Sequence, residues 1–347
     1  MMPTLRTIAC LPVAGPSNPY PHLMMDGLNE TPGIRAFNGI HDKFFGIART
    51  LLMHRPTYLH FDWISSYYFR RWRWLTYLSV LTFCAQIMLA RRMGVKVVWT
   101  LHNILPHDSP ALRVHRFCQR FLARRCEWIR VFSEETVARA AAELGVPEGT
   151  FRVVPEGDYS HVYANHISRE EARKKLGLSG EAKVILNIGL IKPYKGILEL
   201  MEAFDTLQHP NTYLVIAGKV MDQEYGKKIR ARLSDRVTLV DEFIPADELQ
   251  VYFNAADLVV LPFQSIENSG SVIMAMGFAR PIIAPRMGVV QERLIQQDEW
   301  LYDSIHELPA KLRYATELPQ GTLEAAGNRN FEALAKYTWQ DFALLFL

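Results

Sequence analysis

Apolar runs of strand length alternate with helical patterns along the whole chain. In the first half the runs are "RTIACLPV", "PTYLHF", "VKVVWTL", "WIRVFS" and "FRVVPEG", and in the second half "KVILNIGL", "TYLVIAG", "VTLVDEF", "ADLVVLPF" and "RPIIAP". Between them, segments such as 134–144 and 196–208 carry apolar residues at the spacing of an amphipathic helix. Strands that alternate with helices build parallel sheets covered by helices on both faces. The pattern predicts an α/β fold with about five strands in each half.

The length of the chain predicts two domains. A domain usually takes roughly 100 to 200 residues, so 347 residues can bury two hydrophobic cores. The stretch 160–182 turns polar and ends in a Gly/Ser turn, as a linker does. We expect two doubly wound, Rossmann-like domains that face each other across a cleft. Their expected bounds are 1–165 and 166–322, with the helical segment 323–347 returning to the first domain.

One helical segment, "RRWRWLTYLSVLTFCAQIMLARRMG" at 70–94, is unusually apolar between arginine-rich ends. Its uncharged core, 75–90, has 16 residues, whereas a membrane span needs roughly 20. We therefore expect a buried helix of the α/β domain, a helix that leans on a membrane, or both at once. Arginine and aromatic side chains suit the headgroup layer of a bilayer. The side chains predicted to face the membrane are Arg70, Arg71, Trp72, Arg73 and Trp74.

The charge of the chain is unevenly spread. Through Asn165 there are 19 Lys and Arg against 12 Asp and Glu, or +7, and afterwards 20 against 24, or −4. The basic first half predicts an anionic partner, namely membrane or lipid phosphates. Nucleic acid is not expected as a partner, because the sequence has no zinc-finger spacing and no RNP-type motif.

Cysteine usage and the first residues indicate a cytosolic protein. The cysteines form no CxxC pair and fit neither a metal site nor a disulfide framework; they are Cys10, Cys84, Cys118 and Cys126. We expect them to be reduced thiols. The first residues show no charged start followed by a long apolar stretch, so no signal peptide is expected.

Ligands of doubly wound sheets bind beyond the carboxyl ends of the strands, so the residues that follow each strand are the candidates for chemistry. In "NIGLIKPYKGILELMEAF" a strand ends at Gly189, a loop carries Lys192 and Lys195, and Gly196 opens a helix. A glycine permits a tight turn beside a ligand, and two ammonium groups next to a helix start suit a diphosphate.

A polar turn also precedes the apolar helix of "LPFQSIENSGSVIMAMGFARPIIAP". Its Ser-Gly-Ser run offers backbone N–H groups, hydroxyls and the positive end of a helix dipole, and Glu267 can hold ribose hydroxyls. Ordinary helix capping is the alternative explanation for these polar residues. The expected diphosphate- and nucleotide-binding residues are Gly189, Lys192, Lys195, Glu267, Asn268, Ser269, Gly270 and Ser271.

Histidines and carboxylates gather after two strands of the first half. "VVWTLHNILPHDS" carries His102, His107 and Asp108, and "PTYLHFDW" ends in His60 and Asp62. No metal is expected, because His-x4-His with one Asp is not a strong ligand spacing without help from elsewhere.

Several of these motifs resemble a known family. "TLHNILPHD", "GLIKPYKG" and "NSGSVIMAMGFARPIIAP", with "SNPYPHL" near the start, look like GT-B glycosyltransferases of the family-four type, above all the bacterial exopolysaccharide β-1,4-mannosyltransferases of the xanthan-assembly type. The likeness spans both halves. It implies that Lys195 and Lys192 hold the donor diphosphate and that His102 touches the donor sugar; His107 is a second candidate for that contact. Leu190 and Met274 stand where many members carry an arginine and a ribose-binding glutamate.

The resemblance implies transfer of a hexose, in the first place mannose from GDP-mannose, onto a polyprenyl-diphosphate-linked glycan in exopolysaccharide synthesis. Inversion at the anomeric carbon requires a general base, for which Asp108 is the first candidate and Asp62 the second. No metal or cofactor beyond the nucleotide-sugar substrate is expected. The expected location is peripheral, on the cytoplasmic face of the inner membrane. The alternatives are another donor such as a UDP-sugar, a nucleotide-sugar 2-epimerase, or a non-catalytic partner in a polysaccharide assembly complex.

Overall fold

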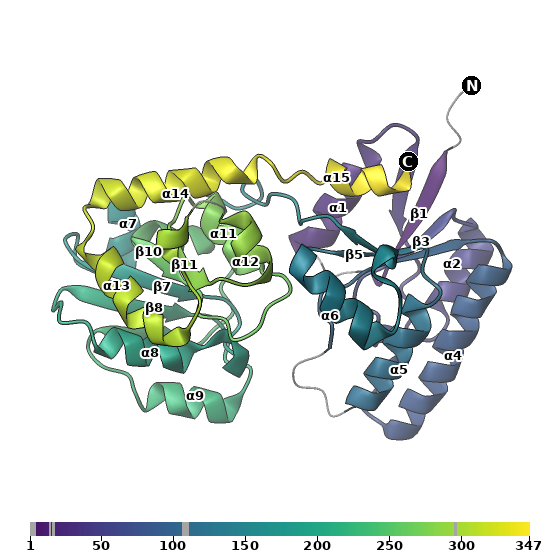
Figure 1. The fold of residues 1–347 in the computed structure, drawn as a ribbon, viewed down its shortest axis with the longest axis horizontal. Helices are drawn as coiled ribbons and strands as arrows, with labels where there is room; N and C mark the ends of the chain where they lie inside the picture. Colours follow the sequence, from purple (N-terminus) through teal and green to yellow (C-terminus); the bar gives the residue numbers. More distant parts are fainter. Residues whose placement is uncertain (1–4, 14, 16–17, 106–110, 295–296) are drawn as a thin grey trace. The chain divides into compact units, whose positions relative to one another are not determined.

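The structure is a computed structural model that describes residues 5–13, 15, 18–105, 111–294 and 297–347. It contains two compact units, one of Met1–Gly157 with Tyr337–Leu347 and one of Asp158–Lys336. Each unit holds a parallel sheet with helices packed on it (Figure 1). The first boundary therefore falls at Gly157, ahead of the polar stretch that we expected to contain it, and only Tyr337–Leu347 join the first unit.

The sheet of the first unit has six strands among the described residues, in the order β2-β1-β3-β4-β5-β6. All neighbouring pairs are parallel. Five of the strands match the predicted runs, and β2 was not predicted. The bounds are β1 Arg6–Leu11, β2 Ile34–Asn38, β3 Tyr58–Phe61, β4 Lys96–Thr100, β5 Trp128–Val131 and β6 Phe151–Val153.

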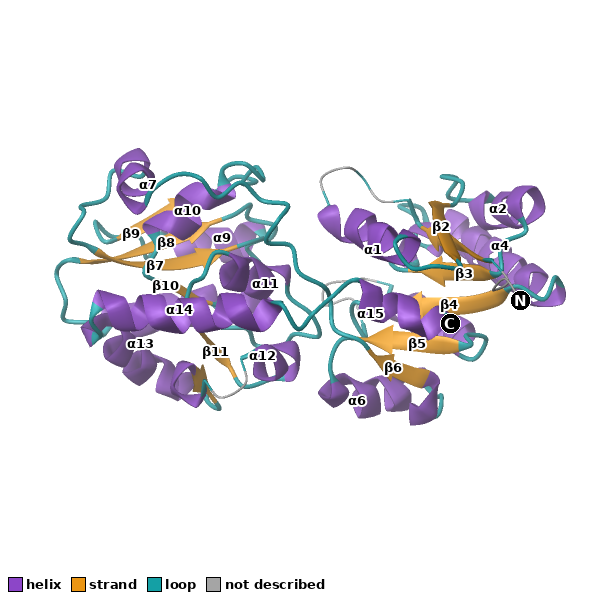
Figure 2. Cartoon of the chain, turned by 90° about the horizontal axis from the view of Figure 1, so that it is seen from above, coloured by secondary structure: helices purple, strands orange, loops and turns teal. Residues whose placement is uncertain are grey.

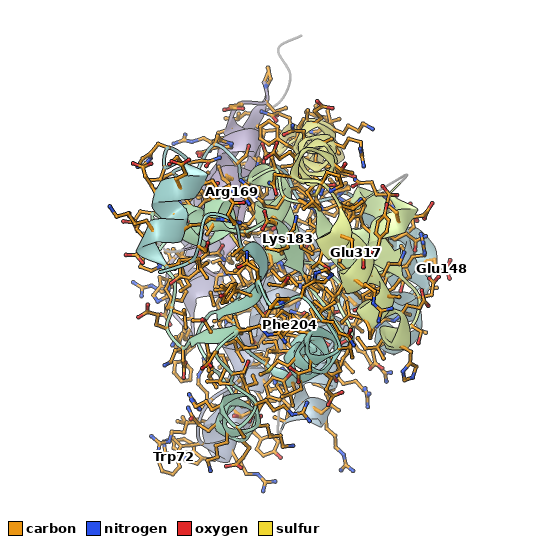
Figure 3. The ribbon with its side chains drawn as sticks, turned by 90° about the vertical axis from the view of Figure 1, so that its left-hand side faces the viewer. Trp72, Glu148, Arg169, Lys183, Phe204 and Glu317 are labelled. Atoms are coloured by element: carbon orange, nitrogen blue, oxygen red, sulfur yellow. The ribbon has the colours of Figure 1, made fainter. Side chains whose placement is uncertain are left out.

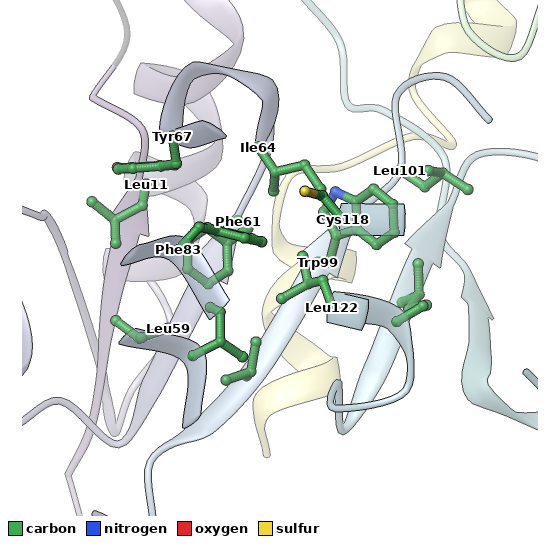
Figure 4. Packing of buried hydrophobic residues seen from close by; sticks show 14 of the residues in the cluster. Leu11, Leu59, Phe61, Ile64, Tyr67, Phe83, Trp99, Leu101, Cys118 and Leu122 are labelled. Carbon is green, nitrogen blue, oxygen red and sulfur yellow. The ribbon is translucent and has the colours of Figure 1, made fainter. Parts of the chain in front are cut away.

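Helices cover both faces of this sheet. Its helices are α1 Pro19–Asn29, α2 Gly46–His54, α3 Ser65–Tyr68, α4 Arg73–Arg92, α5 Leu112–Ala123, α6 Glu134–Leu144 and α15 Gln340–Ala343, with 3-10 turns η1 Glu148–Thr150 and η5 Leu344–Phe346. Helices α2, α4, α5 and α6 share one core cluster with the sheet, and Figure 4 shows Phe61, Phe83 and Trp99 within it. On the other face, Phe342 and Phe346 of the returning segment pack edge-on against Trp128.

Helix α4 is the segment with arginine-rich ends. Its 20 residues are long and apolar enough to cross a membrane, judged by length and composition alone. In the structure it is one helix of the α/β layer, with Phe83, Ile87 and Ala90 fully buried. Gln86 also ties it to its neighbours, since its side-chain oxygen accepts from the Ala48 N–H at 2.8 Å. The expectation of a helix that belongs to the domain therefore agrees with its packing.

The sheet of the second unit also has six strands among the described residues, in the order β12-β11-β10-β7-β8-β9. The two-residue strand β12 was not predicted. The bounds are β7 Lys183–Ile188, β8 Thr212–Ala217, β9 Val237–Val240, β10 Leu258–Val260, β11 Ile282–Pro285 and β12 Leu301–Tyr302.

The helices of the second unit include α14 Gln320–Leu334, which lies along α11 Gly270–Gly277 (Figure 2). The expected return of 323–347 to the first domain thus begins only after α14. The other helices are α7 Arg169–Lys175, α8 Ile197–Asp205, α9 Gln223–Arg230, α10 Leu249–Ala255, α12 Gly288–Arg293 and α13 Leu308–Glu317, with turns η2 Pro193–Lys195, η3 Asp298–Trp300 and η4 Ile305–Glu307.

A buried carboxylate fixes the start of the second unit. Asp257 is 1% exposed and lies between two arginines of α7. Its Oδ2 is 2.9 Å from Arg173 Nη2, and its Oδ1 is 2.5 Å from Arg169 Nη2. Figure 3 labels Arg169. The same Oδ2 accepts the Val184 N–H of β7 at 2.7 Å. One side chain thereby joins α7 to the central strands of the sheet.

Candidate active site

Asp62 and His102 meet at the carboxyl edge of the first sheet. Strands β3 and β4 are neighbours with Phe61 opposite Trp99, so the residues that follow them lie at the same edge. His102 Nε2 is 2.9 Å from Asp62 Oδ1. The ring of Trp63 stacks on the imidazole, with 4.4 Å between ring centroids and 19° between the planes. Two residues that the sequence singled out separately are therefore in direct contact.

Asp62 is enclosed by the protein. The residue is 4% exposed, the Tyr20 hydroxyl donates to Oδ1 at 3.0 Å, and His60 Nδ1 lies 3.8 Å from Oδ2. Burial by itself raises the pKa of Asp62, but the interaction with His60 and the hydrogen bonds from His102 and Tyr20 outweigh burial and hold the pKa below its usual range. An ionised carboxylate whose neighbours are all protein groups is better placed to orient His102 than to receive a proton from a substrate.

Two further residues of this network were not predicted as site residues. Arg130 is fully buried inside β5; its Nε donates to the Val154 carbonyl at 2.9 Å, and its Nη1 is 3.4 Å from the Tyr20 hydroxyl. His60 Nε2 lies 2.8 Å from Thr100 Oγ1, and burial lowers its pKa to about 4, so its ring is neutral near pH 7. The sequence did contain a signal for the buried network at Arg130, because a charged residue within the buried strand "WIRVFS" requires internal partners.

A small cavity of about 160 Å³ adjoins the pair. Its wall includes Asn103 and a second hydrogen-bonded couple, in which the Tyr68 hydroxyl lies 2.9 Å from His115 Nδ1. Gln119 is 5% exposed, and its Oε1 has no hydrogen-bond partner among the described residues. These polar side chains suit a ligand that is rich in hydroxyl groups. His107 and Asp108, which were predicted for this loop, lie outside the described residues.

The predicted diphosphate residues of the second unit come together at the ends of β7 and β10. Gly189 has φ +128°, and a Cβ there would lie 2.9 Å from Ser271 Oγ. The Ser271 hydroxyl donates to the Ile188 carbonyl at 3.1 Å. The end of β7 and the first turn of α11 are therefore in contact, as the shared edge of a parallel sheet requires.

Lys195 lies in the loop beside them. The next residue, Gly196, has φ +68°, and a Cβ there would come within 1.9 Å of the Pro262 carbonyl oxygen, so only glycine permits this approach. Lys195 Nζ lies 4.6 Å from the ring centroid of Phe263. Burial, with a smaller contribution from Lys192, lowers its pKa to about 8. The two loops thus hold a partly buried ammonium group at this edge.

The first turn of α11 is capped by a side chain, but part of its backbone still faces open space. Ser269 is the N-cap, and its Oγ accepts the Val272 N–H at 3.4 Å, so the capping explanation for this serine holds. A Cβ at Gly270 would meet nothing within 4 Å, so the backbone there faces open space. Glu267 is 5% exposed and Asn268 is half-buried. The described residues contain no group of three or more His, Cys, Asp or Glu side chains that could hold a metal ion.

The predicted membrane-facing residues divide into two kinds. Arg71 and Arg73 are exposed, as are Trp72 at 60% and Trp74 at 66%. Arg70 differs from the prediction, because its half-buried guanidinium lies over the Phe44 ring and is bound by the main chain. It donates to the carbonyl oxygens of Lys43, Ser66, Tyr67 and Phe69. Arg70 therefore holds the turn that precedes α4.

Helix α4 exposes apolar side chains where an ordinary surface helix is polar. Its buried face is mixed, since Thr76, Ser79 and Gln86 lie there beside apolar residues. Its exposed face carries the apolar side chains Trp74, Tyr77, Leu78, Leu81 and Met88, which we call the α4 stripe. Contiguous exposed apolar residues of this kind mark a surface for a protein or membrane partner.

Comparison with known proteins identifies the fold and the family. The structure is similar to sucrose-phosphate synthase of Thermosynechococcus elongatus, with a TM-score of 0.73 and 17% identity over 98% of this chain and 97% of that one. It is equally similar to Anabaena HepE solved with UDP and glucose, at a TM-score of 0.73 and 15% identity over 99% of each chain. The fold is that of the GT-B glycosyltransferases, as predicted.

Two family models match the chain, a glycosyl transferase 4-like domain over residues 43–157 and a glycosyl transferases group 1 domain over 168–328. The protein is a glycosyltransferase that contains both of these domains. Its relatives include a GDP-mannose:glycolipid 4-beta-D-mannosyltransferase of Xanthomonas campestris pv. campestris, 27% identical over 277 residues, which are 78% of this chain and 70% of that protein. Another is a lipopolysaccharide 1,2-N-acetylglucosaminetransferase of Salmonella typhimurium, 28% identical over 213 residues, which are 58% of this chain and 52% of that protein.

Proposed function

We propose that the protein transfers mannose from GDP-mannose to a glycolipid during exopolysaccharide synthesis. The observation that carries this proposal is the likeness to the Xanthomonas GDP-mannose:glycolipid 4-beta-D-mannosyltransferase, which extends over both units of the chain. The proposed acceptor is a glycan on a polyprenyl diphosphate. Because GDP-mannose is an α-linked donor, a β-linked product requires inversion in a single displacement.

The second unit would hold the donor diphosphate. Lys195 and Lys192 supply positive charge, and the open first turn of α11 at Gly270 offers backbone N–H groups and the helix dipole. These groups also stabilise the negative charge that develops on the departing nucleoside diphosphate. The lysines can therefore serve the leaving group without a metal ion, and we propose no cofactor beyond the nucleotide-sugar.

The first unit would present the sugar-contacting imidazole. Asp62 would accept a hydrogen bond from the Nε2–H of His102, so that Nδ1 is the ring nitrogen left to face the sugar. Nδ1 makes no hydrogen bond to a described residue, so it is available to a hydroxyl of the bound sugar. Asp62 is then a positioning residue for His102, and Asp108 remains the first candidate for the base that activates the acceptor hydroxyl.

The α4 stripe would attach the enzyme to the cytoplasmic face of the inner membrane as a peripheral protein. Trp72 and Trp74 can enter the headgroup layer while Arg71 and Arg73 meet lipid phosphates. We expect wild type to float with anionic liposomes and a Trp72→Ala/Trp74→Ala/Leu81→Ala variant to stay in the dense fraction. Equal flotation of the two proteins contradicts this attachment.

The donor is tested by thermal shift with GDP, UDP, ADP and dTDP, because a ligand that binds only the folded state raises its stability by about 2.7 kcal/mol at a hundredfold excess over Kd. GDP should give the largest shift. Radiolabelled GDP-mannose incubated with a lipid extract should then yield a labelled glycolipid, whose anomeric configuration NMR assigns. A shift with UDP alone, or an α-linked product, would contradict the proposal.

A further inference from the structure

A strongly basic pocket lies between the starts of α4 and α5 in the first unit. Its cavity volume is about 800 Å³. Five of its lining residues are arginines, and no described lining residue is acidic. The lining residues are Phe69, Arg70, Arg71, Arg73, Thr76, Tyr77, Ala111, Leu112, Arg113, Val114 and Arg116.

The pocket continues along α5. Arginines recur there at positions 113, 116, 120 and 124, a spacing of three and four residues that places them on one face of the helix. A second cavity of about 670 Å³ runs over this face and shares Arg113 and Arg116 with the first. We call the two cavities together the arginine groove. The spacing is visible in the sequence, although the prediction of an anionic partner used these arginines only as part of the net charge.

The charges of the groove are only partly neutralised by the protein. Glu143 of α6 pairs with Arg116 at 2.5 Å and with Arg120 at 3.6 Å. By contrast, the side chains of Arg71, Arg73 and Arg113 form no ion pair or hydrogen bond with the described residues. Three arginines that pair with no carboxylate of the described residues attract an anion, and the planar guanidinium binds phosphate oxygens in pairs.

Apolar side chains border the same pocket. Tyr77 is 57% exposed and belongs to the α4 stripe, Leu112 is 39% exposed, and Phe117 is 54% exposed in the continuation along α5. A phosphate with an apolar chain attached matches both the charged floor and this apolar border, whereas free phosphate would use only the floor. The combination therefore favours a membrane lipid.

We propose that the arginine groove binds the phosphate headgroup of a membrane lipid, with Arg71, Arg73 and Arg113 as the phosphate ligands. The site rests on the membrane attachment proposed above, and it adds the place where the charge of the lipid is recognised. Arg70 is excluded from the ligand set because the main chain already occupies its guanidinium.

The test is flotation of an Arg71→Gln/Arg73→Gln/Arg113→Gln variant with vesicles of phosphatidylcholine alone and of phosphatidylcholine with phosphatidylglycerol. Each arginine near an anionic surface contributes about 1 kcal/mol, so partitioning onto the anionic vesicles should fall roughly a hundredfold. The matched control is Arg91→Gln/Arg92→Gln/Arg139→Gln, which removes the same formal charge outside the groove. The control variant should lose much less of its partitioning onto the anionic vesicles. All variants should keep the thermal shift that nucleotide gives.

The outcomes separate the two proposals. If the tryptophan variant loses binding while the groove variant and its control bind alike, membrane attachment stands and the groove proposal is overturned. If wild type fails to float with either vesicle, both are overturned, whereas the nucleotide shift still reports on the transferase. In a further arm, inorganic phosphate replaces chloride at equal ionic strength, and binding of phosphate to the protein in solution is measured. If the protein binds phosphate through the groove but never floats with vesicles, its ligand is a free anion. That outcome also overturns the lipid assignment.

Discussion

Asp62 Oδ1 lies 2.9 Å from His102 Nε2, and the same oxygen accepts the hydroxyl of Tyr20, which comes from a helix near the start of the chain. The stacked ring of Trp63 restricts the imidazole further. The two contacts therefore restrain the orientation of His102, and a hydrogen bond donated to Asp62 would place its proton on Nε2.

We expect Asp62→Asn to lower kcat on the order of a hundredfold, because an amide can donate to Nε2 and thereby favour the wrong tautomer of His102. The pH profile of kcat should change as well, which a purely structural role would not cause. The comparison is with Asp298→Asn, a substitution of an exposed carboxylate in the second unit. A rate and profile equal to wild type would remove the orienting role.

Lys195→Met should weaken GDP binding by roughly ten- to a hundredfold, because a hydrogen bond to a charged group contributes about 1.5–3 kcal/mol. Isothermal titration calorimetry measures the change. The matched control is Lys219→Met, which removes a half-exposed lysine that pairs with Asp241 in a neighbouring loop. If both variants bind GDP equally well, Lys195 does not contact the diphosphate.

The lowered pKa of Lys195 makes nucleotide affinity depend on pH. A bound diphosphate favours the charged ammonium, and Lys195 is already charged below its pKa of about 8, so affinity is full there. Above it, binding must take up a proton, and affinity should fall about tenfold between pH 7 and pH 9. Calorimetric titrations in buffers of different ionisation enthalpy measure how many protons are taken up when the nucleotide binds. Lys195→Arg should abolish the dependence, because a guanidinium stays charged; a proton uptake that persists in this variant comes from another group.

Asp257→Ala should lower the free energy of unfolding by about 3–5 kcal/mol, because it leaves the buried guanidinium of Arg173 without its counter-charge. Urea denaturation followed by circular dichroism measures this change. Asp298→Ala breaks a pair in which the Asp298 side chain is 77% exposed, and it should change stability by less than about 1 kcal/mol. Similar losses in both variants would argue against a special role of the buried ion pair.

Gly196→Ala should disturb the donor site more than the loss of a left-handed glycine by itself would. Gly177 has a nearly identical φ of +67°, but a Cβ there meets nothing within 4 Å, whereas a Cβ at Gly196 would meet the Pro262 carbonyl oxygen at 1.9 Å. Gly177→Ala should therefore cost only about 1–2 kcal/mol of backbone strain. Gly196→Ala should also reduce GDP affinity, because the loop that carries Lys195 must move. Parallel unfolding and binding measurements on the two variants check this.

The main features of the fold could be predicted because the central strands are predominantly apolar runs, which single polar residues such as His60 and Arg130 do not obscure. The two strands that were missed lie at the edges of their sheets: β2 contains the exposed Arg35, and β12 has two residues. Edge strands bury less surface, so their apolar pattern is weaker.

Parts of the site could be predicted for a similar reason, since Asp62, His102, Gly189 and Lys195 each follow a strand or precede a helix. Tyr20 could not, because it reaches Asp62 from a helix 42 positions away in sequence. Nor does sequence distinguish Arg70, which is bound to main-chain oxygens, from its neighbour Arg71, whose guanidinium donates no hydrogen bond to a described residue. That difference arises from how the chain turns before α4.

The first unit receives its last aromatic residues from the far end of the chain, since Phe342 and Phe346 lie against Trp128 and Tyr58. During translation the strands that carry Trp128 and Tyr58 leave the ribosome long before either phenylalanine is made. The whole second unit is synthesised in that interval. Nascent chains should therefore leave one face of the first sheet, around Trp128 and Tyr58, partly uncovered until the segment with Phe342 and Phe346 has been made.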